Sequence, residues 1–370
     1  MKIALLQDQL LTCAGSERVF LHMTNEFKEA DIFTLCYNKD STWPEFKEKK
    51  INTHPLGQYI KNHKQFKLAF PISTYMMQFW NFNDYDLIIS SSATTAKYIN
   101  NFNGIHICYC YFPTRAIWNY DAYFEKKGIK EFIFSFMINY FKKRDIDAAS
   151  RVHHFFSISE MTKKYVKKIY GRESEVLFSP VETVKEANHI NKDNEEFYLI
   201  VSRLEKWKKI DYAIEAFNFN KKKLIIIGTG PDEKYLRSMS NENIFFKGFV
   251  DTLSLASYLK SAKAVIHTPY LEYGLVPIEA AVYGTPSICY GEGGVVETMN
   301  DKQKINGEIL TSVFFNHQNA KSLNNAIDEF EKISFNKDDI KKYADKFSVN
   351  LFKNTLRKSV NKFVEKYSEK

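Results

Sequence analysis

Short apolar runs alternate along the chain with longer segments in which apolar residues recur at helical spacing. The predicted strands include residues 2–6, 86–92, 155–159, 197–202, 224–227 and 264–267, with 287–290 as the last one. Another strand begins at residue 105 and runs into a loop at Pro113. The predicted helices include residues 17–27, 160–170 and 211–219. Strands and helices in this alternation are typical of parallel α/β sheets.

The length of the chain and one polar segment predict two domains. A chain of 370 residues is too long for one ordinary hydrophobic core. Residues 186–196 are rich in Asn, Lys and Glu, which is typical of a linker. We therefore expect a Rossmann-like domain at residues 1–185, a second one at 197–348, and a final helical segment at 349–370.

The most informative stretch runs from Tyr270 to Pro286 and follows a predicted strand. Pro277 is expected at the first position of a short helix, and Gly284 is expected to end that helix in the left-handed conformation. The backbone amides at the helix start are then unpaired donors that carry part of the helix dipole. They belong to Leu275, Val276, Ile278 and Glu279. Such a site suits a phosphate group.

Two carboxylates, Glu272 and Glu279, flank this predicted phosphate site. Because carboxylates repel phosphate, a ligand here must also offer hydroxyl groups, as a nucleotide sugar does. A basic loop after the predicted strand 197–202 contains Arg203 and Lys208 and precedes a helix. Arg203 can bind phosphate oxygens through two parallel N–H groups, and Lys208 can bind as a point charge.

These segments resemble family 4 retaining glycosyltransferases, nearest to bacterial lipopolysaccharide and O-antigen mannosyltransferases. The resemblance rests on Tyr273-Gly-Leu-Val-Pro-Ile-Glu-Ala280 with Gly284-Thr-Pro286, on Arg203-Leu with Lys208, and on Gly15-Ser-Glu-Arg18. It implies the GT-B fold, in which two Rossmann-like, doubly wound α/β domains face each other across a cleft. It also implies that the last helix, at about 349–367, crosses back to the N-terminal domain.

The resemblance assigns roles in the C-terminal domain to particular residues. Glu279 would bind the ribose of the donor, and Arg203 and Lys208 would bind its diphosphate and stabilise the leaving group. Glu272 matches the catalytic glutamate less directly, because it lies one position nearer to Glu279 than in the family. The amides of Gly274, Leu275 and Val276 would contact the phosphates. The nucleobase would lie against Gly248, Phe249 and Val250.

In the N-terminal domain, the resemblance places Gly15 and Ser16 near the donor's phosphate and sugar. Ser16 is also expected to cap the helix that follows. Tyr111 stands where the mannosyltransferases have a histidine that contacts the donor sugar, and it is grouped with the catalytic residues. Arg115 and Trp118 are expected on the acceptor side, because ligands bind beyond the carboxyl ends of parallel strands.

The implied activity is transfer of a hexose, preferably mannose, to a growing lipid-linked or surface glycan. The implied donor is GDP-mannose, with a UDP-sugar as the alternative. Asp84-Tyr-Asp86 and Asp145-Ile-Asp147 match the metal motif of another glycosyltransferase fold, but neither follows a predicted strand, so we expect no metal cofactor. A catalytically silent nucleotide-sugar-binding partner and a nucleotide-sugar epimerase of the same fold remain alternatives.

Composition adds expectations about location and partners. The net charge is +8, and the five cysteines form no CxxC pair, which favours reduced core cysteines in a cytoplasmic protein. No nucleic-acid partner is expected. The aromatic segments 129–144 and 65–82 are expected to pack against their own sheet, with contact to the inner face of the plasma membrane as the alternative. His106 is expected to be a core or edge histidine.

Overall fold

The computed structural model describes residues 1–100, 102–119, 129–188, 190, 196–300 and 310–368. It forms two compact units. Unit 1 contains Met1–Ser179 together with Asn350–Lys370, and unit 2 contains Pro180–Val349. Residues 189 and 191–195 of the predicted linker lie outside the described residues.

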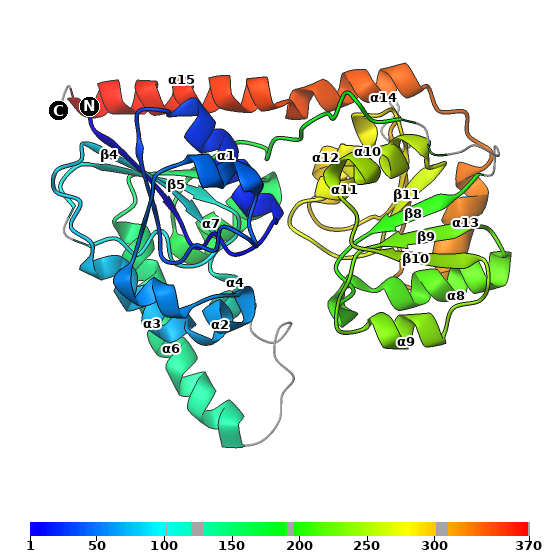
Figure 1. Ribbon diagram of the computed structural model, residues 1–370, viewed down its shortest axis with the longest axis horizontal. Coiled ribbons are helices and arrows are strands. Elements are labelled where there is room, and N and C mark those ends of the chain that lie inside the picture. Colours follow the sequence, from blue (N-terminus) through cyan, green and yellow to red (C-terminus); the bar gives the residue numbers. More distant parts are fainter. Residues whose placement is uncertain (101, 120–128, 189, 191–195, 301–309, 369–370) are drawn as a thin grey trace. The chain divides into compact units, whose positions relative to one another are not determined.

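Unit 1 is built on a parallel sheet whose seven described strands have the order β3-β2-β1-β4-β5-β6-β7 (Figure 1). The strands are β1 (Ile3–Gln7), β2 (Asp31–Thr34), β3 (Ile51–Thr53), β4 (Leu87–Ser92), β5 (Ile105–Cys110), β6 (His154–Ser157) and β7 (Ser174–Val176). The central strands β1, β4 and β5 are buried almost throughout, as strands covered on both faces must be.

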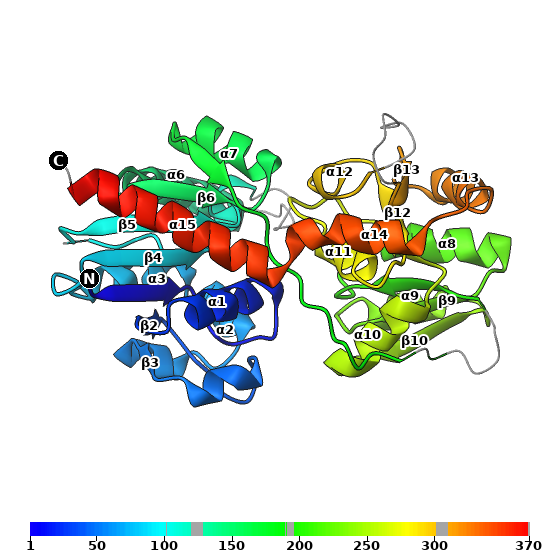
Figure 2. The ribbon, with the colours of Figure 1, turned by 90° about the horizontal axis from the view of Figure 1, so that it is seen from above.

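Helices of unit 1 cover both faces of this sheet (Figure 2). They are α1 (Gly15–Glu26), α2 (His63–Leu68), α3 (Phe70–Met76), α4 (Arg115–Trp118), α6 (Ile129–Ser150), α7 (Glu160–Tyr170) and α15 (Val349–Ser368), with short 3-10 turns η1 (Pro44–Glu48), η2 (Pro55–Tyr59) and η3 (Met77–Phe79). The last helix, α15, packs against the N-terminal part of unit 1. The ring of Phe352 lies 5.8 Å from that of Tyr109, and Arg357 pairs with Glu26 and Glu29 at 2.8 and 2.9 Å.

Unit 2 contains a second parallel sheet, with the described strand order β10-β9-β8-β11-β12-β13. Its strands are β8 (Tyr198–Val201), β9 (Leu224–Ile227), β10 (Ile244–Gly248), β11 (Ala264–His267), β12 (Ser287–Tyr290) and β13 (Ser312–Phe315). Its helices are α8 (Ile210–Asn220), α9 (Glu233–Ser238), α10 (Thr252–Ser261), α11 (Leu275–Ala281), α12 (Val295–Thr298), α13 (Ala320–Phe330) and α14 (Lys337–Ala344), with 3-10 turns η4 (Lys206–Lys208) and η6 (Asp345–Phe347).

The core of unit 2 forms two layers, one on each face of the sheet. Phe217 of α8 and Ile327 of α13 pack on one face, and Leu259 of α10 and Ala280 of α11 pack on the other. This is the doubly wound arrangement that the alternating sequence pattern predicted. Together with unit 1 it gives the two Rossmann-like domains of the GT-B fold.

Two predictions about elements are wrong. Residues 287–290 are not the last strand, because β13 follows at Ser312–Phe315. Ser16 does not cap α1, because that helix begins at Gly15, its capping position is Ala14, and the Ser16 hydroxyl donates to Glu17 instead.

Candidate functional site

The strand order of unit 2 locates a crevice between the loops that follow β8 and β11. From β8 the chain moves outward through β9 and β10 and then returns to β11 on the other side of β8. Loops at such a reversal diverge, and ligands of doubly wound sheets bind there, beyond the carboxyl ends of the strands. The sequence-predicted residues Arg203 and Lys208 follow β8, and Glu272 and Gly274 follow β11.

The loop after β8 holds its two cations around one indole ring. Lys208 Nζ lies 4.1 Å from the centroid of Trp207, and Arg203 Cζ lies 6.0 Å from it. Glu205 accepts a hydrogen bond from the Trp207 indole and lies 3.3 Å from the Arg203 guanidinium. The Arg203 side chain is 58% exposed, so its guanidinium faces solvent and is accessible to a ligand.

Thr268 ties the two loops together. Its hydroxyl donates to the carbonyl of Lys208 at 2.7 Å, and its own carbonyl accepts from Tyr212 at 2.7 Å and from Gln318 at 3.0 Å. The backbone of Lys208 is therefore fixed to the end of β11. Sequence reasoning gave no signal for Thr268, because its partners are distant in the chain.

The loop after β11 packs closely against the glycine-rich segment before α12. A Cβ atom on Gly293 or Gly294 would come within 2.4 Å of the Leu271 carbonyl oxygen or 1.9 Å of the Glu272 carbonyl oxygen, respectively. Gly294 also donates its N–H to the Leu271 carbonyl at 2.7 Å. Glu272 is buried, with 7% of its surface exposed. The two glycines thus let this segment support the loop that carries Glu272.

Helix α11 begins two residues earlier than predicted, at Leu275, so Pro277 occupies its third position. Leu275 and Val276 keep unpaired amides at the helix start, whereas the amides of Ile278 and Glu279 fall within the hydrogen-bonded turns. Gly284 follows the helix with φ +80°, as predicted.

Two further predicted features lie on the same edge of this sheet. Gly248 ends β10 with φ +67° and accepts a hydrogen bond from the Gly228 amide at 2.8 Å. No atom lies within 4 Å of a Cβ built on Gly248, so its surroundings are open, and the neighbouring Phe249 is 80% exposed. Val250 packs against the unit 2 core. An exposed ring beside open backbone can receive a planar group by stacking.

His267, the last residue of β11, is a buried neighbour of this site that sequence reasoning missed. Burial and the nearby Lys208 ammonium lower the pKa of His267 to about 3, so the imidazole is neutral at physiological pH. A neutral imidazole adds no charge repulsion against the two cations of the neighbouring loop.

The corresponding crevice of unit 1 is closed by a carboxylate of the protein itself. The order of the unit 1 sheet reverses between β1 and β4. Asp8, just after β1, accepts four backbone N–H groups of the segment after β4, from Ala93, Thr94, Thr95 and Ala96, at 2.6–2.9 Å. The amides that would bind an anion at this reversal are therefore already occupied. The crevice of unit 2, in contrast, has Arg203 and Lys208 on the loop that follows β8.

Unit 1 brings Tyr111 and Ser16 together. The Tyr111 hydroxyl donates to the Ser16 carbonyl at 3.0 Å and shares a 2.9 Å hydrogen bond with Ser91. Burial raises the pKa of Tyr111 well above its usual value, so this phenol does not act as a base near neutral pH. Tyr111 supports the loop that carries Gly15 and Ser16.

Glu17 is a buried carboxylate beside these residues that was not predicted as part of the site. It is 1% exposed and accepts hydrogen bonds from Thr12 and Ser16, both at 2.7 Å. Burial raises its pKa, and the two hydrogen bonds partly oppose that effect. The Gly-Ser-Glu-Arg motif contained the signal, but only the structure shows that the glutamate points inward.

Trp118 is held by a buried network rather than free for an acceptor. Its indole N–H donates to Asp145 at 2.7 Å, and Asp145 also accepts from Tyr98, Thr114 and Tyr170. Asp145 therefore has a structural role. Arg115, at the start of α4, lies with its guanidinium carbon 5.5 Å from the ring of Phe112.

The other residues considered for catalysis or metal binding have mostly structural roles. His106 is buried and hydrogen-bonds Ser90 at 2.8 Å, as predicted for a core histidine. All five cysteines are free, but Cys13 is exposed, so the prediction of core cysteines is wrong there. Among the described residues, no group of three or more His, Cys, Asp or Glu side chains could hold a metal ion.

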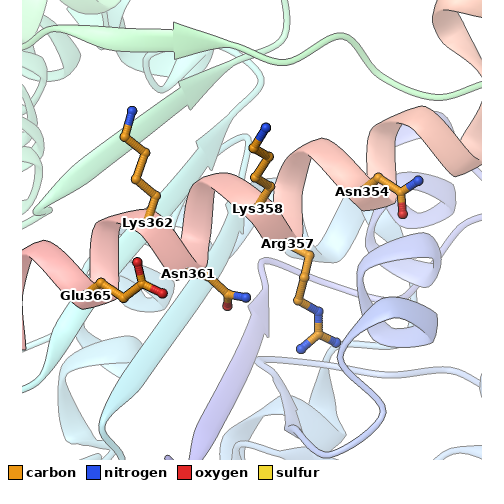
Figure 3. Close-up of a pocket in the computed structure, with 6 residues that line it drawn as sticks. All are labelled: Asn354, Arg357, Lys358, Asn361, Lys362 and Glu365. Atoms are coloured by element: carbon orange, nitrogen blue, oxygen red, sulfur yellow. The ribbon is translucent and has the colours of Figure 1, made fainter.

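Two surface hollows lie away from the predicted residues. One of about 520 Å³ runs along α15 and is lined by Asn354, Arg357, Lys358, Asn361, Lys362 and Glu365 (Figure 3). The other, of about 260 Å³, lies in unit 2 and includes Lys260, Tyr283, Lys337 and Lys341. No predicted site residue lines either hollow. Within the described chain, no helix is both long and apolar enough to cross a bilayer.

Comparison with known proteins identifies the enzyme class of this chain. Residues 181–347, nearly all of unit 2, match the family model described as glycosyl transferases group 1. The chain is a glycosyltransferase. The predicted glycosyltransferase class is thereby confirmed, and the solved structures described below confirm the predicted GT-B fold.

Relatives of this glycosyltransferase include mannosyltransferases. Alpha-1,3/1,6-mannosyltransferase ALG2 of Kluyveromyces lactis is 22% identical over 90% of this chain and 78% of its own length. The same enzyme of Candida glabrata is 22% identical over 90% of this chain and 85% of its own length. An uncharacterized glycosyltransferase of Methanocaldococcus jannaschii reaches 34% identity, but over 31% of this chain and 32% of its own.

Solved structures share the fold of this glycosyltransferase at low sequence identity. Anabaena HepE in complex with UDP-glucose matches with a TM-score of 0.70 and 15% identity, covering 98% of this chain and 100% of that one. Sucrose-phosphate synthase of Thermosynechococcus elongatus matches with a TM-score of 0.72 and 15% identity, covering 98% and 99%.

Proposed function

We propose that this glycosyltransferase moves a hexose, preferably mannose, from a nucleotide sugar to a growing lipid-linked or surface glycan, with retention of anomeric configuration. The proposal rests above all on one observation. Arg203 and Lys208 on one side, and Glu272 and the start of α11 on the other, follow the two strands between which the order of the unit 2 sheet reverses.

The donor would lie on unit 2. Its diphosphate would bind Arg203, Lys208 and the amides of Leu275 and Val276, and its ribose would bind Glu279. The base would lie against Gly248, Phe249 and Val250, where the backbone is open and the phenyl ring is exposed. Contacts to the acceptor are assigned to unit 1, at Arg115 and on the surface near Trp118.

The chemical task of these residues is to stabilise the departing diphosphate. Negative charge accumulates on the leaving group in an oxocarbenium-like transition state, so preorganised cations lower the barrier most where the bond breaks. Trp207, Glu205 and Thr268 hold the loop of Arg203 and Lys208 before any ligand binds. Glu272 would face the donor sugar from a buried position. No step of this scheme requires a metal ion.

GDP-mannose is the proposed donor, because the ALG2 relatives are named as mannosyltransferases. A UDP-sugar is the alternative, since the HepE structures contain UDP and UDP-glucose. Calorimetry with GDP, UDP and their sugars, followed by analysis of the transferred sugar, distinguishes the two. Tighter binding of UDP-glucose than of GDP-mannose would overturn the assignment of the donor.

The site itself is tested by Arg203→Ala and Lys208→Ala. Each change removes a cation from the leaving group, and kcat should fall on the order of a hundred-fold or more, since one such group contributes about 3–4 kcal/mol. Lys206→Ala, in the same loop, is the matched control and should change kcat less than about threefold. Unchanged turnover in both Arg203→Ala and Lys208→Ala would refute the diphosphate assignment.

A catalytically silent nucleotide-sugar-binding protein is the second candidate. It is favoured by Tyr111, whose hydroxyl supports the Ser16 loop where the resembled enzymes have a histidine. A protein of this kind would bind the nucleotide sugar in calorimetry but would neither hydrolyse nor transfer it. Conversion of the free nucleotide sugar to an epimer would identify the same-fold epimerase instead.

A further inference from the structure

One surface of unit 1 carries a stripe of large, exposed apolar and aromatic side chains. The elements α2, α3 and η3 follow one another almost without interruption from His63 to Phe79. Four large side chains project from them, and their exposed fractions are 76% for Leu68, 60% for Ile72, 38% for Tyr75 and 79% for Phe79. They are contributed by the end of α2, by α3 and by η3, which are consecutive in the chain.

The opposite face of the same segment is fully used by the unit 1 core. Phe66, Met76 and Met77 are buried and pack in the cluster that includes Ile88 of β4. The prediction that residues 65–82 pack against their own sheet therefore holds for one face only. A surface helix normally has polar residues on its outer face, so an apolar outer stripe requires a separate explanation.

The charges around the stripe indicate what covers it. From Lys49 to Asn83 the sequence contains five lysines and no Asp or Glu. Lys64 and Lys67 are exposed on α2 next to Leu68, and Lys61 is exposed just before that helix. An apolar stripe bordered by lysines complements a bilayer surface with anionic headgroups, because the apolar side chains enter the acyl boundary and the lysines contact the headgroups.

The packing around Tyr75 fixes the orientation of the stripe. The Tyr75 hydroxyl hydrogen-bonds that of Tyr140 on α6, and the guanidinium carbon of Arg144 lies 3.9 Å from the Tyr75 ring. The Phe70 ring lies 5.6 Å from that of Phe141. These contacts hold α3, which carries Ile72 and Tyr75, against α6.

We propose that the stripe Leu68, Ile72, Tyr75 and Phe79, with Lys61, Lys64 and Lys67, docks unit 1 onto an anionic lipid bilayer. The inference goes beyond the proposed function, because it concerns a surface of unit 1 outside the donor site. Docking onto a bilayer suits a lipid-linked acceptor, whose sugar end lies at the membrane surface. Membrane binding does not require transfer, so the two proposals can fail separately.

The test is co-sedimentation with vesicles, one set of phosphatidylcholine alone and one of equal parts phosphatidylcholine and phosphatidylglycerol. The wild-type protein should bind the anionic vesicles at least about tenfold more strongly, and this difference should shrink at high salt. The triple variant Leu68→Ser/Ile72→Ser/Phe79→Ser should lose at least about tenfold in binding to anionic vesicles. Lys61→Gln/Lys64→Gln/Lys67→Gln should lose the preference for anionic lipid.

Unit 2 supplies a matched control. Phe219, Tyr235 and Leu253 are also exposed, at 81%, 59% and 46%, but the sequence around them is not depleted of acidic residues. Their triple replacement by serine should leave vesicle binding unchanged. Both triple serine variants should keep wild-type thermal unfolding and wild-type hydrolysis of the donor in solution, which needs no bilayer.

Three results would overturn the proposal. The first is that the wild-type protein binds neither kind of vesicle. The second is that the stripe variant binds as well as the wild type, and the third is that both triple serine variants lose binding equally. Sedimentation velocity without lipid tests whether the stripe instead binds a second copy of the chain. A concentration-dependent dimer that the stripe variant abolishes would assign the stripe to self-association instead.

Discussion

The ammonium of Lys97 lies 2.9 Å from the Oδ1 atom of Asp145, and the two side chains are 1% and 0% exposed. Lys97 also donates to the Thr94 carbonyl at 2.9 Å and to the Thr114 hydroxyl at 2.7 Å. Although burial alone would raise the pKa of Asp145, the Lys97 charge and the surrounding hydrogen bonds lower it, so this carboxylate stays ionised. The pair joins the segment after β4 to α4 and α6.

Removing one charge of this pair should destabilise unit 1 strongly. Asp145→Asn leaves the Lys97 ammonium buried without a counter-charge, and we expect the free energy of unfolding to fall by about 3–5 kcal/mol. Asp147→Asn is the matched control, because that carboxylate is 66% exposed and pairs with Arg151 on the surface. Its loss should cost less than about 1 kcal/mol in urea titrations. Equal losses for the two variants would contradict the structural role of Asp145.

Two buried histidines should make stability fall as the pH drops below neutral. The pKa values of His106 and His267 are each lowered to about 3, first by burial and then by nearby cationic groups. In the unfolded chain both should titrate near pH 6.5. Between about pH 6.5 and 3 the unfolded state therefore binds more protons, and stability is lost with decreasing pH.

The measurement is urea unfolding across that pH range. His106→Gln should reduce the slope of stability against pH by about 1.4 kcal/mol per pH unit, the contribution of one proton. A His106→Gln slope equal to that of the wild type would mean that His106 is protonated in the folded state.

Local sequence patterns predicted the parts of the site that local structure determines. The bounds of β11 and β12 and the left-handed Gly284 follow from apolar runs and from the backbone freedom of glycine. The position of Arg203 and Lys208 between a strand and a helix was predictable for the same reason, and their role in binding diphosphate stays a prediction. The helix start at Leu275 was missed because proline is tolerated throughout the first helical turn, so Pro277 did not fix the first residue.

Long-range partners could not be predicted from the sequence. Asp8 and Asp145 look like ordinary acidic residues in the chain, and their roles depend on amides and side chains 25 to 88 positions away. The strand β13 was missed because its apolar run, Val313–Phe315, has only three residues and carries no turn signal of its own. Tertiary pairing, rather than local propensity, determines such elements.

Tyr111 should prove to be a supporting residue. Tyr111→Phe removes the hydrogen bonds to the Ser16 carbonyl and to Ser91 but keeps the ring, whose centroid lies 5.3 Å from that of Tyr109. We expect a stability loss of about 1–2 kcal/mol and less than a tenfold change in kcat, with an unchanged pH–rate profile. A loss of two orders of magnitude in kcat, or the disappearance of a limb of that profile, would instead make Tyr111 a catalytic residue.

Lys209 occupies a backbone conformation that favours glycine. Its φ is 56°, between the turn η4 and helix α8, and a Cβ atom in this region costs roughly 1–2 kcal/mol. Lys209→Gly should therefore raise the free energy of unfolding by about 0.5–1 kcal/mol, after allowance for the greater freedom of glycine in the unfolded chain. Lys206→Gly, at the start of η4, should lower it instead. A stability loss in Lys209→Gly would show that its side chain makes compensating contacts.

Asp8 should stabilise the crevice of unit 1 far more than an ordinary surface carboxylate does. Asp8→Asn replaces an acceptor of four backbone N–H groups with an amide whose own N–H₂ faces those donors. We expect a loss of about 3 kcal/mol in unfolding free energy, because buried amides are left without an acceptor. Asp86→Asn is the control, since its 65% exposed carboxylate accepts one backbone N–H, from Lys2, at the surface. Its cost should stay below about 1 kcal/mol, and an equal cost for Asp8→Asn would mean that water replaces the lost carboxylate oxygens.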